Sequence, residues 1–349
     1  MKVVICNWGY SGYWAACWRE LMTRAELRVF TPQTAYPYPP EILEGLPVEV
    51  LDDARLADAR GVANRVVAER PDVLVVNGWM SSAFRAVAAD PRLGDVTKVL
   101  IADTSWEGSL RQILARFRLH RYVKQFDGMI VGGRRGARFA RWIGFPADRV
   151  FRSIYGYDAG AFANCLPSRL QKPSWPKRFC FVGRYAPVKG LDTLLRAYAA
   201  YRGRVRDPWP LDCYGKGVLA DALSKVAGVV DHGFLGPREL PAALTEEGAF
   251  VFPSLCEPWG VALAEAAGAG LPLVCSASVT SGDDLVRSGE NGFVVRTGNV
   301  SALCEALVAV HNGYSQLAGW GRRSLELAAD FAPEAWADRW MEAFDALRR

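Results

Sequence analysis

Short apolar runs, rich in β-branched residues, alternate with longer helix-like stretches along the whole chain. Several of these runs are continuously apolar, which is typical of strands buried on both faces of a sheet. Regular alternation of strands and helices predicts an α/β fold built on doubly wound parallel sheets. The expected strands are Lys2–Cys6, Glu26–Phe30, Val48–Leu51, Asp72–Val76, Lys98–Ile101, Met129–Val131, Val150–Ile154, Arg178–Val182, Leu211–Tyr214, Ala249–Phe252, Leu273–Cys275 and Phe293–Val295.

The alternation is interrupted once, at residues 166–177, where three prolines lie among serine, lysine and glutamine. This composition is typical of a linker. Since 349 residues are too many for one ordinary compact domain, we expect two domains. The expected boundaries are 1–165 for an N-terminal domain, 166–177 for the linker, 178–331 for a C-terminal domain and 332–349 for a terminal helix.

Helical patterns predict helices over 54–69, 110–125 and 333–347. The last of these carries Trp336, Trp340 and Phe344 on one face, and that face needs a packing partner. Ligands of open α/β domains bind at the carboxyl ends of the strands, so a cleft between the two domains is the expected ligand site.

Positive charge is concentrated in one segment of the chain. The whole chain has 42 Lys and Arg against 37 Asp and Glu, whereas Arg111–Arg152 holds eleven cations and two acids. Such a segment suits phosphates, an anionic lipid surface or an acidic acceptor, and it is equally the composition of a solvated helical face. We expect no nucleic-acid partner.

Cysteine and histidine usage argues against a metal centre. None of the eight cysteines forms a Cys-x-x-Cys pair, and the three histidines are not clustered. The first apolar run is too short for a signal peptide, and no run approaches the length of a transmembrane helix. We expect a soluble, cytoplasmic protein, and the basic segment Arg111–Arg152 adds the alternative of peripheral contact with the inner face of an anionic membrane.

Two cations follow the first strand of the C-terminal half. Arg184 and Lys189 lie in the loop after Gly183, ahead of a predicted helix. A guanidinium fork and an ammonium group suit the two phosphates of a diphosphate. A glycine-flanked turn follows the next strand at residues 215–217, and a further glycine turn lies at residues 232–237 ahead of a helix. Each of them either cradles a base or simply turns the chain.

The most informative segment is residues 252–272, in which a buried strand runs into a loop and a small-residue helix. Glu257 precedes a proline and is therefore expected in the loop, and Glu265 lies one or two turns into the helix. The first amides of such a helix suit hydroxyl or phosphate oxygens. Eight residues of helix span about 12 Å, which exceeds the 5 to 9.5 Å between the carboxylates of glycosidases. The two glutamates are thus predicted to hold two ends of one long ligand.

Taken in their order along the chain, the cation-bearing loop, the glycine turns and the segment with the two glutamates resemble the family 4 glycosyltransferases. These enzymes have the GT-B fold and retain the anomeric configuration. The resemblance covers most of the chain and is strongest over residues 178–295. The spacing of Glu257 and Glu265 is similar to the family's Glu-(seven residues)-Glu signature, and residues 283–295 resemble its next stretch. The resemblance implies two Rossmann-like doubly wound domains facing a central cleft, with the C-terminal helix crossing back to the N-terminal domain.

The same resemblance assigns roles to residues of the C-terminal half. Arg184 and Lys189 would bind the donor diphosphate, Glu257 would contact the donor sugar, and Glu265 would hold the ribose hydroxyls. The other donor-binding residues that it implies in this half are Gly183, Gly215, Lys216, Phe234, Leu235, Trp259, Gly260 and Val261.

The N-terminal half resembles the family more loosely. Gly9 and Gly12 follow the first strand where the family has a glycine-rich loop that reaches the donor phosphate and the acceptor. Residues 154–162 resemble the family's Asn-Gly-Val-Asp segment, although Tyr155 replaces the asparagine and Tyr157 the valine.

Asp103 lies near the place where the family often has a histidine that faces the transferred sugar. Because of this departure, three residues are candidates for the N-domain contact with the reacting centre, namely Asp103, Trp106 and Glu107. The catalytic set implied for the whole chain is Arg184, Lys189, Glu257 and Asp103.

The predicted function is a retaining hexosyltransferase that moves a sugar from a UDP- or GDP-sugar to a hydroxyl of a glycan, a lipid-linked or a small-molecule acceptor in polysaccharide or glycoconjugate biosynthesis. No Asp-x-Asp motif occurs, so neither a metal nor another cofactor is expected. The alternatives are a non-catalytic nucleotide-sugar-binding regulator or partner subunit, and an epimerase or phosphorylase on the same fold. A dinucleotide dehydrogenase is disfavoured because the loop after the first strand lacks the three-glycine fingerprint.

Overall fold

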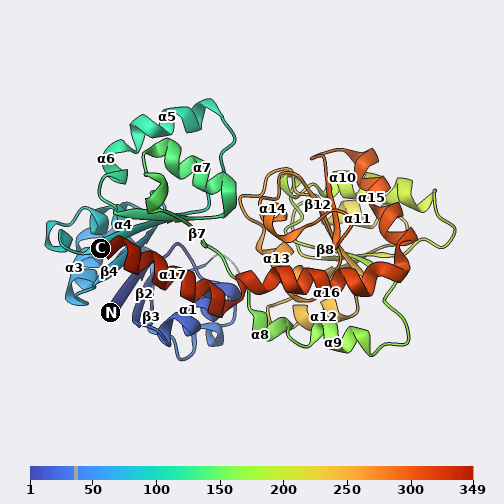
Figure 1. Ribbon diagram of the computed structural model, residues 1–349, viewed down its shortest axis with the longest axis horizontal. Helices are drawn as coiled ribbons and strands as arrows, with labels where there is room; N and C mark the ends of the chain where they lie inside the picture. Colours follow the sequence, from blue (N-terminus) through green and yellow to red (C-terminus); the bar gives the residue numbers. More distant parts are fainter. Residues whose placement is uncertain (35–37, 349) are drawn as a thin grey trace. The chain divides into compact units, whose positions relative to one another are not determined.

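The computed structural model describes residues 1–34 and 38–348, and its chain divides into two compact units. Unit 1 comprises Met1–Tyr157 and Phe331–Arg349, and unit 2 comprises Asp158–Asp330. Each unit is a parallel sheet with helices on its faces (Figure 1).

The sheet of unit 1 has seven strands in the order β3-β2-β1-β4-β5-β6-β7, and every ladder described in it is parallel. All seven strands were expected from the sequence, and their ends differ from the expected ones by two residues at most. The strands are β1 Lys2–Cys6, β2 Glu26–Pro32, β3 Val48–Leu51, β4 Val73–Asn77, β5 Thr97–Ala102, β6 Gly128–Val131 and β7 Val150–Arg152.

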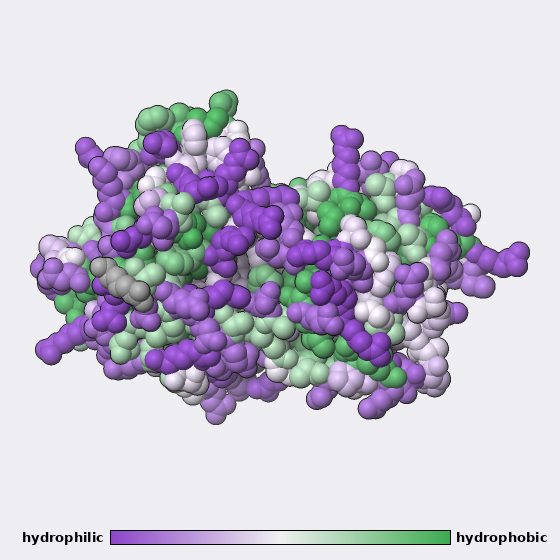
Figure 2. Space-filling view, in the orientation of Figure 1, coloured by the Kyte–Doolittle hydropathy of each residue, from purple (hydrophilic) through white to green (hydrophobic). Residues whose placement is uncertain are grey.

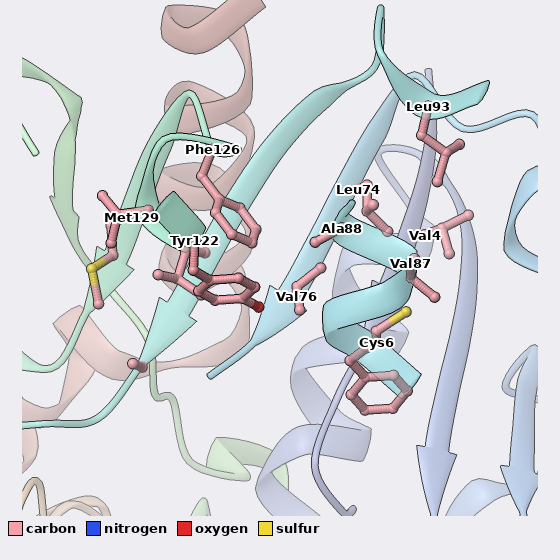
Figure 3. Close-up of a cluster of buried hydrophobic side chains, with 14 of the residues drawn as sticks. Val4, Cys6, Leu74, Val76, Val87, Ala88, Leu93, Tyr122, Phe126 and Met129 are labelled. Carbon is pink, nitrogen blue, oxygen red and sulfur yellow. The ribbon is translucent and has the colours of Figure 1, made fainter. Parts of the chain in front are cut away.

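Side chains of the central strands alternate between two cores, because successive residues of a strand point to opposite faces of the sheet. Val4 and Cys6 belong to one core, which Figure 3 shows with Leu74 and Val76, and Val3 and Ile5 belong to the other. Helices cover both faces. They are α1 Gly12–Met22, α2 Asp53–Ala57, α3 Ala59–Ala68, α4 Ser82–Ala88, α5 Leu110–Arg118, α6 His120–Val123, α7 Gly133–Ile143 and α17 Pro333–Arg348, with short 3₁₀ segments at Pro40–Leu43, Pro91–Leu93 and Ala147–Arg149.

The terminal helix α17 packs on the second of these cores, so the predicted return of the chain to the N-terminal domain is correct. Its apolar face, with Trp336, Trp340 and Phe344 all fully buried, lies against α1. Two indole groups also fix it to the end of the sheet: Trp336 Nε1 donates to the Ile154 carbonyl oxygen at 3.1 Å, and Trp340 Nε1 to that of Ser153.

Two predicted helices of unit 1 are each interrupted. The helix expected over 54–69 is split at Asp58, whose carboxylate accepts a hydrogen bond from the Gly61 amide and so caps a new helix, α3. The helix expected over 110–125 is split at Leu119 into α5 and α6. At Asp58, capping by a short polar side chain competes with helix continuation, and hydrophobic periodicity does not reveal it, whereas the start of α6 has no side-chain cap.

The sheet of unit 2 has six parallel strands in the order β10-β9-β8-β11-β12-β13. Five of them were expected, and β10 was not predicted, since the sequence indicated only a glycine turn over residues 232–237, which overlaps the end of this strand. It is the edge strand and its residues are half-buried or exposed, so it lacks the apolar pattern of a buried strand. The strands are β8 Phe179–Val182, β9 Leu211–Tyr214, β10 Val229–Gly233, β11 Ala249–Phe252, β12 Leu273–Ser276 and β13 Gly292–Val295.

The helices of unit 2 connect these strands and cover both faces of the sheet (Figure 1). They are α8 Ala159–Phe162, α9 Cys165–Leu170, α10 Leu191–Arg202, α11 Ala220–Leu223, α12 Leu240–Thr245, α13 Val261–Gly268, α14 Gly282–Leu285, α15 Val300–Asn312 and α16 Leu317–Ala328, with 3₁₀ segments at Pro187–Lys189, Tyr314–Gln316 and Ala329–Phe331.

The predicted linker at 166–177 is not a linker, and the chain instead enters unit 2 after Tyr157. Arg169 is 1% exposed, and its guanidinium donates to the carbonyl oxygens of Leu244, Ala269 and Gly270. Trp175 is buried too, and its indole donates to the Gly248 carbonyl oxygen at 2.8 Å. The proline-rich composition suggested a solvated segment, but long-range hydrogen bonds from two side chains hold it in the unit.

Within the part of the chain that the structure describes, every helix is too short or too polar to cross a membrane. Seven of the eight cysteines are buried.

Candidate functional site

The order of the strands in unit 2 reverses next to β8. From β8 the chain continues through β9 and β10 on one side, and then crosses to β11 on the other. Ligands of open α/β sheets bind outside the carboxyl ends of the strands at such a switch point. The loops that follow β8 and β11 carry Lys189 and Glu257, so these two candidate residues lie on either side of the switch point.

The backbones of these two loops are in direct contact. Gly190 has φ +70°, and a Cβ atom at this position would lie 2.1 Å from the Pro253 carbonyl oxygen. The Leu255 amide donates to the Val188 carbonyl oxygen at 2.8 Å. Glycine is therefore required at position 190, both for the left-handed backbone and for the close approach that brings the two loops together.

Lys189 and Glu257 form an ion pair in which the Lys189 ammonium donates to Glu257 Oε2. The hydroxyl of Ser254 donates to the same oxygen at 3.2 Å. The side chains of Lys189 and Glu257 are 15% and 12% exposed, and Lys189 Nζ lies 5.6 Å from the centre of the Phe252 ring. A cation and a carboxylate are thus held together, largely shielded from solvent, at the carboxyl ends of the central strands β8 and β11.

Arg184 precedes this pair in the same loop and is exposed. In the part of the chain that the structure describes, its guanidinium has neither an ion pair nor a side-chain hydrogen bond. It is therefore available to an external anion. Lys216, at the end of β9, is also exposed and lies with its ammonium 5.2 Å from the Phe234 ring centre, so two more predicted donor-site residues are brought together.

The glycines of residues 215–217 have a packing role that the sequence did not reveal. A Cβ atom at Gly215 would lie 1.9 Å from the Gly183 carbonyl oxygen, and one at Gly217 would lie 2.5 Å from that of Tyr185. The loop after β9 thus lies directly on the backbone of the loop that carries Arg184. This contact accounts for the glycines without a bound base.

Helix α13 begins after Gly260, which has φ +99°. Trp259, just before it, is buried, and its carbonyl oxygen accepts from the Ser281 amide at 3.0 Å. A parallel bridge between Glu257 and Val279 fixes the loop further. Contacts with residues 279–281 thus hold the start of α13, whose first amides are the ones proposed to face the donor.

Glu265 lies on α13, half-buried, with neither an ion pair nor a side-chain hydrogen bond within the described part of the chain. Burial raises the pKa of this carboxyl group to about 8, and the nearby Asp158 carboxylate adds to the effect. A carboxyl group that is desolvated and has no partner in its own chain is typical of a binding site.

Unit 1 has its own switch point, between β1 and β4. Here Asn77 Nδ2 donates to Asn7 Oδ1 at 2.7 Å, and Asn7 Nδ2 donates to the Gly9 carbonyl oxygen at 2.7 Å. Gly9 has φ +96°, and its amide donates to the Thr31 hydroxyl at 3.1 Å. Gly12 is the first residue of α1. Sequence reasoning selected the two glycines but missed the asparagine pair that holds their loop.

Asp103 follows β5 and is exposed. Its carboxylate Oδ2 accepts a hydrogen bond of 3.0 Å from the hydroxyl of Tyr155, the residue that stands in place of the expected asparagine. Two of the three positions at which this chain departs from the family pattern therefore contact each other. Of the other two candidates, Trp106 packs against Trp142 at 5.1 Å between ring centres, and Glu107 is exposed.

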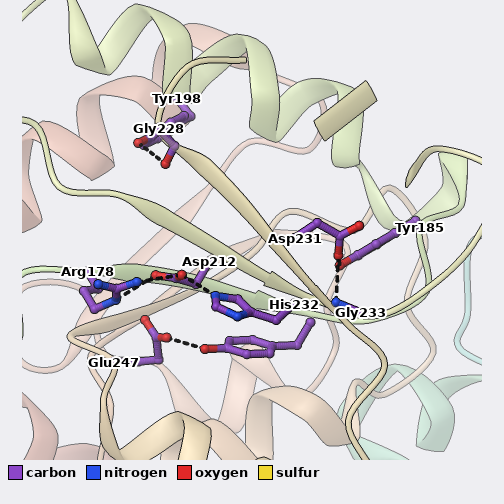
Figure 4. A network of polar contacts seen from close by, with 10 residues as sticks. Arg178, Tyr185, Tyr198, Asp212, Gly228, Asp231, His232, Gly233 and Glu247 are labelled. Atoms are coloured by element: carbon purple, nitrogen blue, oxygen red, sulfur yellow. Dashed lines mark hydrogen bonds and ion pairs between the residues drawn. The ribbon is translucent and has the colours of Figure 1, made fainter. Parts of the chain in front are cut away.

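A polar network at β8, β9 and β10 was also missed (Figure 4). Asp212 is fully buried and binds Arg178 through both carboxylate oxygens at 2.8 Å, as well as His232 at 2.6 Å. The Tyr214 hydroxyl donates to Glu247, whose pKa is raised to about 8 by burial and by the charge of Asp212. Arg178 and Asp212 lie near the amino ends of β8 and β9, whereas Tyr214 ends β9 directly before Gly215, so the network runs from the amino ends of these strands to the candidate site.

Within the residues that the structure describes, no three His, Cys, Asp or Glu side chains gather as a metal site would require. Metal independence stays a prediction, since it concerns the reaction.

The two Rossmann-like parallel-sheet units define the GT-B fold. Solved structures show the same architecture over nearly the whole chain. That of Anabaena Alr3699/HepE in complex with UDP has a TM-score of 0.76 at 16% identity and covers 99% of this chain and 100% of its own. The apo form of the lipopolysaccharide outer core galactosyltransferase WaaB has a TM-score of 0.70 at 14% identity, covering 98% and 99%. At these identities the likeness shows the fold alone.

The sequence comparisons point to the same class. Residues 176–312 match the family described as glycosyl transferases group 1. The O-antigen chain mannosyltransferase B of Escherichia coli is 30% identical over 177 residues, which are 47% of this chain and 45% of that protein. The phosphatidyl-myo-inositol mannosyltransferase of Mycobacterium leprae is 31% identical over 168 residues, or 43% and 42%. The chain spans less than half the length of these relatives. Family match and fold together support a GT-B glycosyltransferase, and the assignment to family 4 stays a prediction.

Proposed function

We propose that this protein transfers a hexose from a UDP- or GDP-sugar to an acceptor hydroxyl, with retention of configuration and without a metal. The observation that carries the proposal is the Lys189–Glu257 ion pair across the switch point of unit 2. Arg184 and Glu265, on the adjoining elements, have no ion pair with any residue that the structure describes. Together these four side chains supply cations for a diphosphate and carboxylates for hydroxyl groups.

On this proposal each side chain acts on a different part of the donor. Arg184 and Lys189 bind the diphosphate and stabilise the charge that develops on it as the sugar departs. Glu257 orients the sugar hydroxyls, and Glu265 holds the ribose. Because Lys189 and Glu257 neutralise each other before the donor arrives, the lysine exchanges part of its contact with the glutamate for the phosphate oxygens.

We propose retention because of the resemblance to the family 4 glycosyltransferases, and the roles proposed for these carboxylates argue only against a covalent intermediate. Glu257 is engaged by Lys189 and Ser254, and Glu265 is assigned to the ribose, so neither is placed as a nucleophile. The entering hydroxyl would attack on the face from which the diphosphate leaves, with positioning as the main contribution. In unit 1, Asp103, oriented by Tyr155, is proposed to hold that hydroxyl.

The donor and acceptor classes are suggested by the relatives. The Anabaena structure contains UDP, and the E. coli and M. leprae proteins are named as mannosyltransferases of an O-antigen chain and of phosphatidyl-myo-inositol. We propose a glycan or lipid-linked acceptor on this basis, with Arg111–Arg152 as the segment that faces anionic acceptor or lipid groups.

The test is a thermal-shift screen of the protein against UDP, GDP and their hexose conjugates. A cognate ligand at a hundredfold excess over its dissociation constant adds about 2.7 kcal/mol to the free energy of unfolding. We expect one nucleoside diphosphate to raise the melting temperature, and Glu265→Ala to abolish that rise. A protein that responds to none of these ligands would contradict the proposed donor site.

A second candidate function is nucleotide-sugar binding without transfer. The observation in its favour is that two of the three departures from the family pattern, Asp103 and Tyr155, lie together in unit 1 and are joined by a hydrogen bond. Donor binding without sugar transfer or donor hydrolysis across a broad acceptor panel would support this candidate, and turnover with any acceptor would exclude it.

A further inference from the structure

Helix α5 of unit 1 exposes a row of large apolar side chains. Leu110 and Phe117 are 79% and 74% exposed, and Ile113 and Leu114 are 36% and 47% exposed. No residue of this helix is buried. Figure 2 shows apolar surface gathered where Figure 1 places α5, with hydrophilic side chains beside it.

These four positions form one stripe because their spacing of three, four and seven residues returns to the same side of a helix. The opposite side faces the unit, where Ala115 and Leu119 pack against the core. The indole of Trp142 on α7 donates to the Gln112 carbonyl oxygen at 3.1 Å and holds this inner side. These contacts fix the orientation of α5, and its apolar stripe therefore faces outward.

Cations flank the stripe. Arg111 and Arg118 lie along one side and are exposed, and Arg116 lies along the other, with its guanidinium 5.8 Å from the Trp142 ring centre. Residues 110–124 contain five Lys or Arg and no acid. An apolar stripe bordered by arginines is the pattern of a helix that lies in the interface of a membrane.

We propose that α5 seats unit 1 on an anionic lipid bilayer, with the apolar stripe among the acyl chains and the flanking arginines at the lipid phosphates. A second copy of this chain fits the surface less well, because a two-fold contact on α5 would set cations against cations. Lipid phosphates supply the opposite charge. The helix begins seven residues after Asp103, so a seated α5 would hold the carboxyl edge of β5 next to the membrane surface.

The test is flotation of the whole protein with vesicles of phosphatidylcholine alone or with about one third phosphatidylglycerol. We expect binding to the anionic vesicles at least tenfold tighter than to the neutral ones. Raising the salt concentration should weaken binding and leave a residual part, since salt screens the arginines and not the apolar insertion.

Two variants separate the contributions. The double substitution Leu110→Ser/Phe117→Ser should lower the affinity for anionic vesicles tenfold or more and remove the salt-resistant part. Arg111→Gln/Arg118→Gln should lower the affinity about tenfold and leave a weaker binding that depends less steeply on salt. The control is Val218→Ser, which removes an apolar side chain that is 83% exposed in unit 2 and should change nothing. All these positions are exposed, so the melting temperatures should stay close to that of the unsubstituted protein.

Three results would overturn the proposal. They are absence of binding to anionic vesicles at low salt, binding that Leu110→Ser/Phe117→Ser leaves unchanged, and a concentration-dependent dimer that this variant dissolves. The inference rests on and deepens the part of the proposed function that assigns Arg111–Arg152 to anionic lipid groups. Donor binding and turnover do not enter the measurement, so its failure would leave the proposed donor site and sugar transfer standing.

Discussion

Lys189 and Glu257 are partners of each other in this structure, although each is proposed to bind a different part of the donor. Arg184, five residues before Lys189, has no such partner in the described part of the chain and is exposed. The two cations of the loop thus differ in what they do for the free protein. Lys189 neutralises a carboxylate that is 12% exposed, whereas Arg184 is proposed to contribute to ligand binding alone.

This difference predicts separate outcomes for two substitutions. Arg184→Ala should lower turnover and nucleotide affinity with the melting temperature unchanged. Lys189→Met should lower both and also reduce the free energy of unfolding by about 1–3 kcal/mol, because Glu257 loses the group that compensates its burial. Steady-state kinetics and urea unfolding would be compared with Arg196→Ala, an exposed arginine of α10. Equal stability of all three variants would contradict the prediction that the ion pair of Lys189 with Glu257 stabilises the folded protein.

Glu265 predicts a pH dependence of nucleotide binding. Its pKa of about 8 in the free protein means that much of it is protonated at pH 7 and ionised at pH 9. Ribose hydroxyls donate to the ionised form, so the affinity for the cognate nucleoside diphosphate should rise several-fold from pH 7 to pH 9. Calorimetric titrations of Glu265→Gln should show a lower affinity with a flatter profile. If the variant keeps the full pH dependence, the ribose role is wrong.

At the scale of elements, the site depends on how closely the loops after β8, β9 and β11 approach one another. Glycines at the points of contact allow the loops to come this close: Gly190 lies against Pro253, and Gly215 lies against Gly183. The sequence showed glycines at strand ends, and it showed the strands, because buried parallel strands are continuously apolar. It did not show which loops would touch, because that depends on the lateral order of strands in the sheet.

The same glycine argument predicts opposite effects at two positions. Gly190→Ala should reduce the free energy of unfolding by about 2 kcal/mol or more, because of its left-handed backbone and the clash with Pro253, and should impair nucleotide binding as the loop moves. Gly319 lies inside α16, and a Cβ atom at this position would have nothing within 4 Å apart from the backbone of its own helix. Gly319→Ala should therefore increase the free energy of unfolding by about 0.5–1 kcal/mol. Chemical denaturation measures both. A Gly190→Ala protein as stable as the parent would mean that the loops are not in contact.

At the scale of the whole molecule, each unit combines an apolar core with polar groups fixed by long-range contacts. In unit 2 the carboxyl group of Glu247 is 1% exposed, and its Oε2 has no hydrogen-bond partner within the described residues. In unit 1 two indole groups of α17 reach carbonyl oxygens more than 180 residues away in the chain. Contacts of this kind make each unit cooperative.

The raised pKa of Glu247 predicts how the free energy of unfolding changes with pH. Its pKa is raised to about 8 in the folded protein and is near 4.5 in the unfolded chain, so the folded state holds the proton between these values. The free energy of unfolding should therefore fall as pH rises towards and through about 8. Between pH 6.5 and pH 8.5 the decrease should be smaller in Glu247→Gln, which stays neutral. Thermal unfolding at both pH values measures this. Parallel decreases in the two proteins would show that other groups, Glu265 among them, are responsible.

The sequence alone determined the fold class of this protein, twelve of its strands and the residues proposed to bind the donor. These are encoded locally, in apolar runs, in the glycines that follow them and in a spaced pair of glutamates. Only the tertiary structure decided the rest: the ion pair of Lys189 with Glu257, the contact of Asp103 with Tyr155, the edge strand β10 and the burial of the proline-rich segment by Arg169 and Trp175. Each of these depends on groups brought together from distant parts of the chain, and neither hydrophobic periodicity nor local composition reports on such contacts.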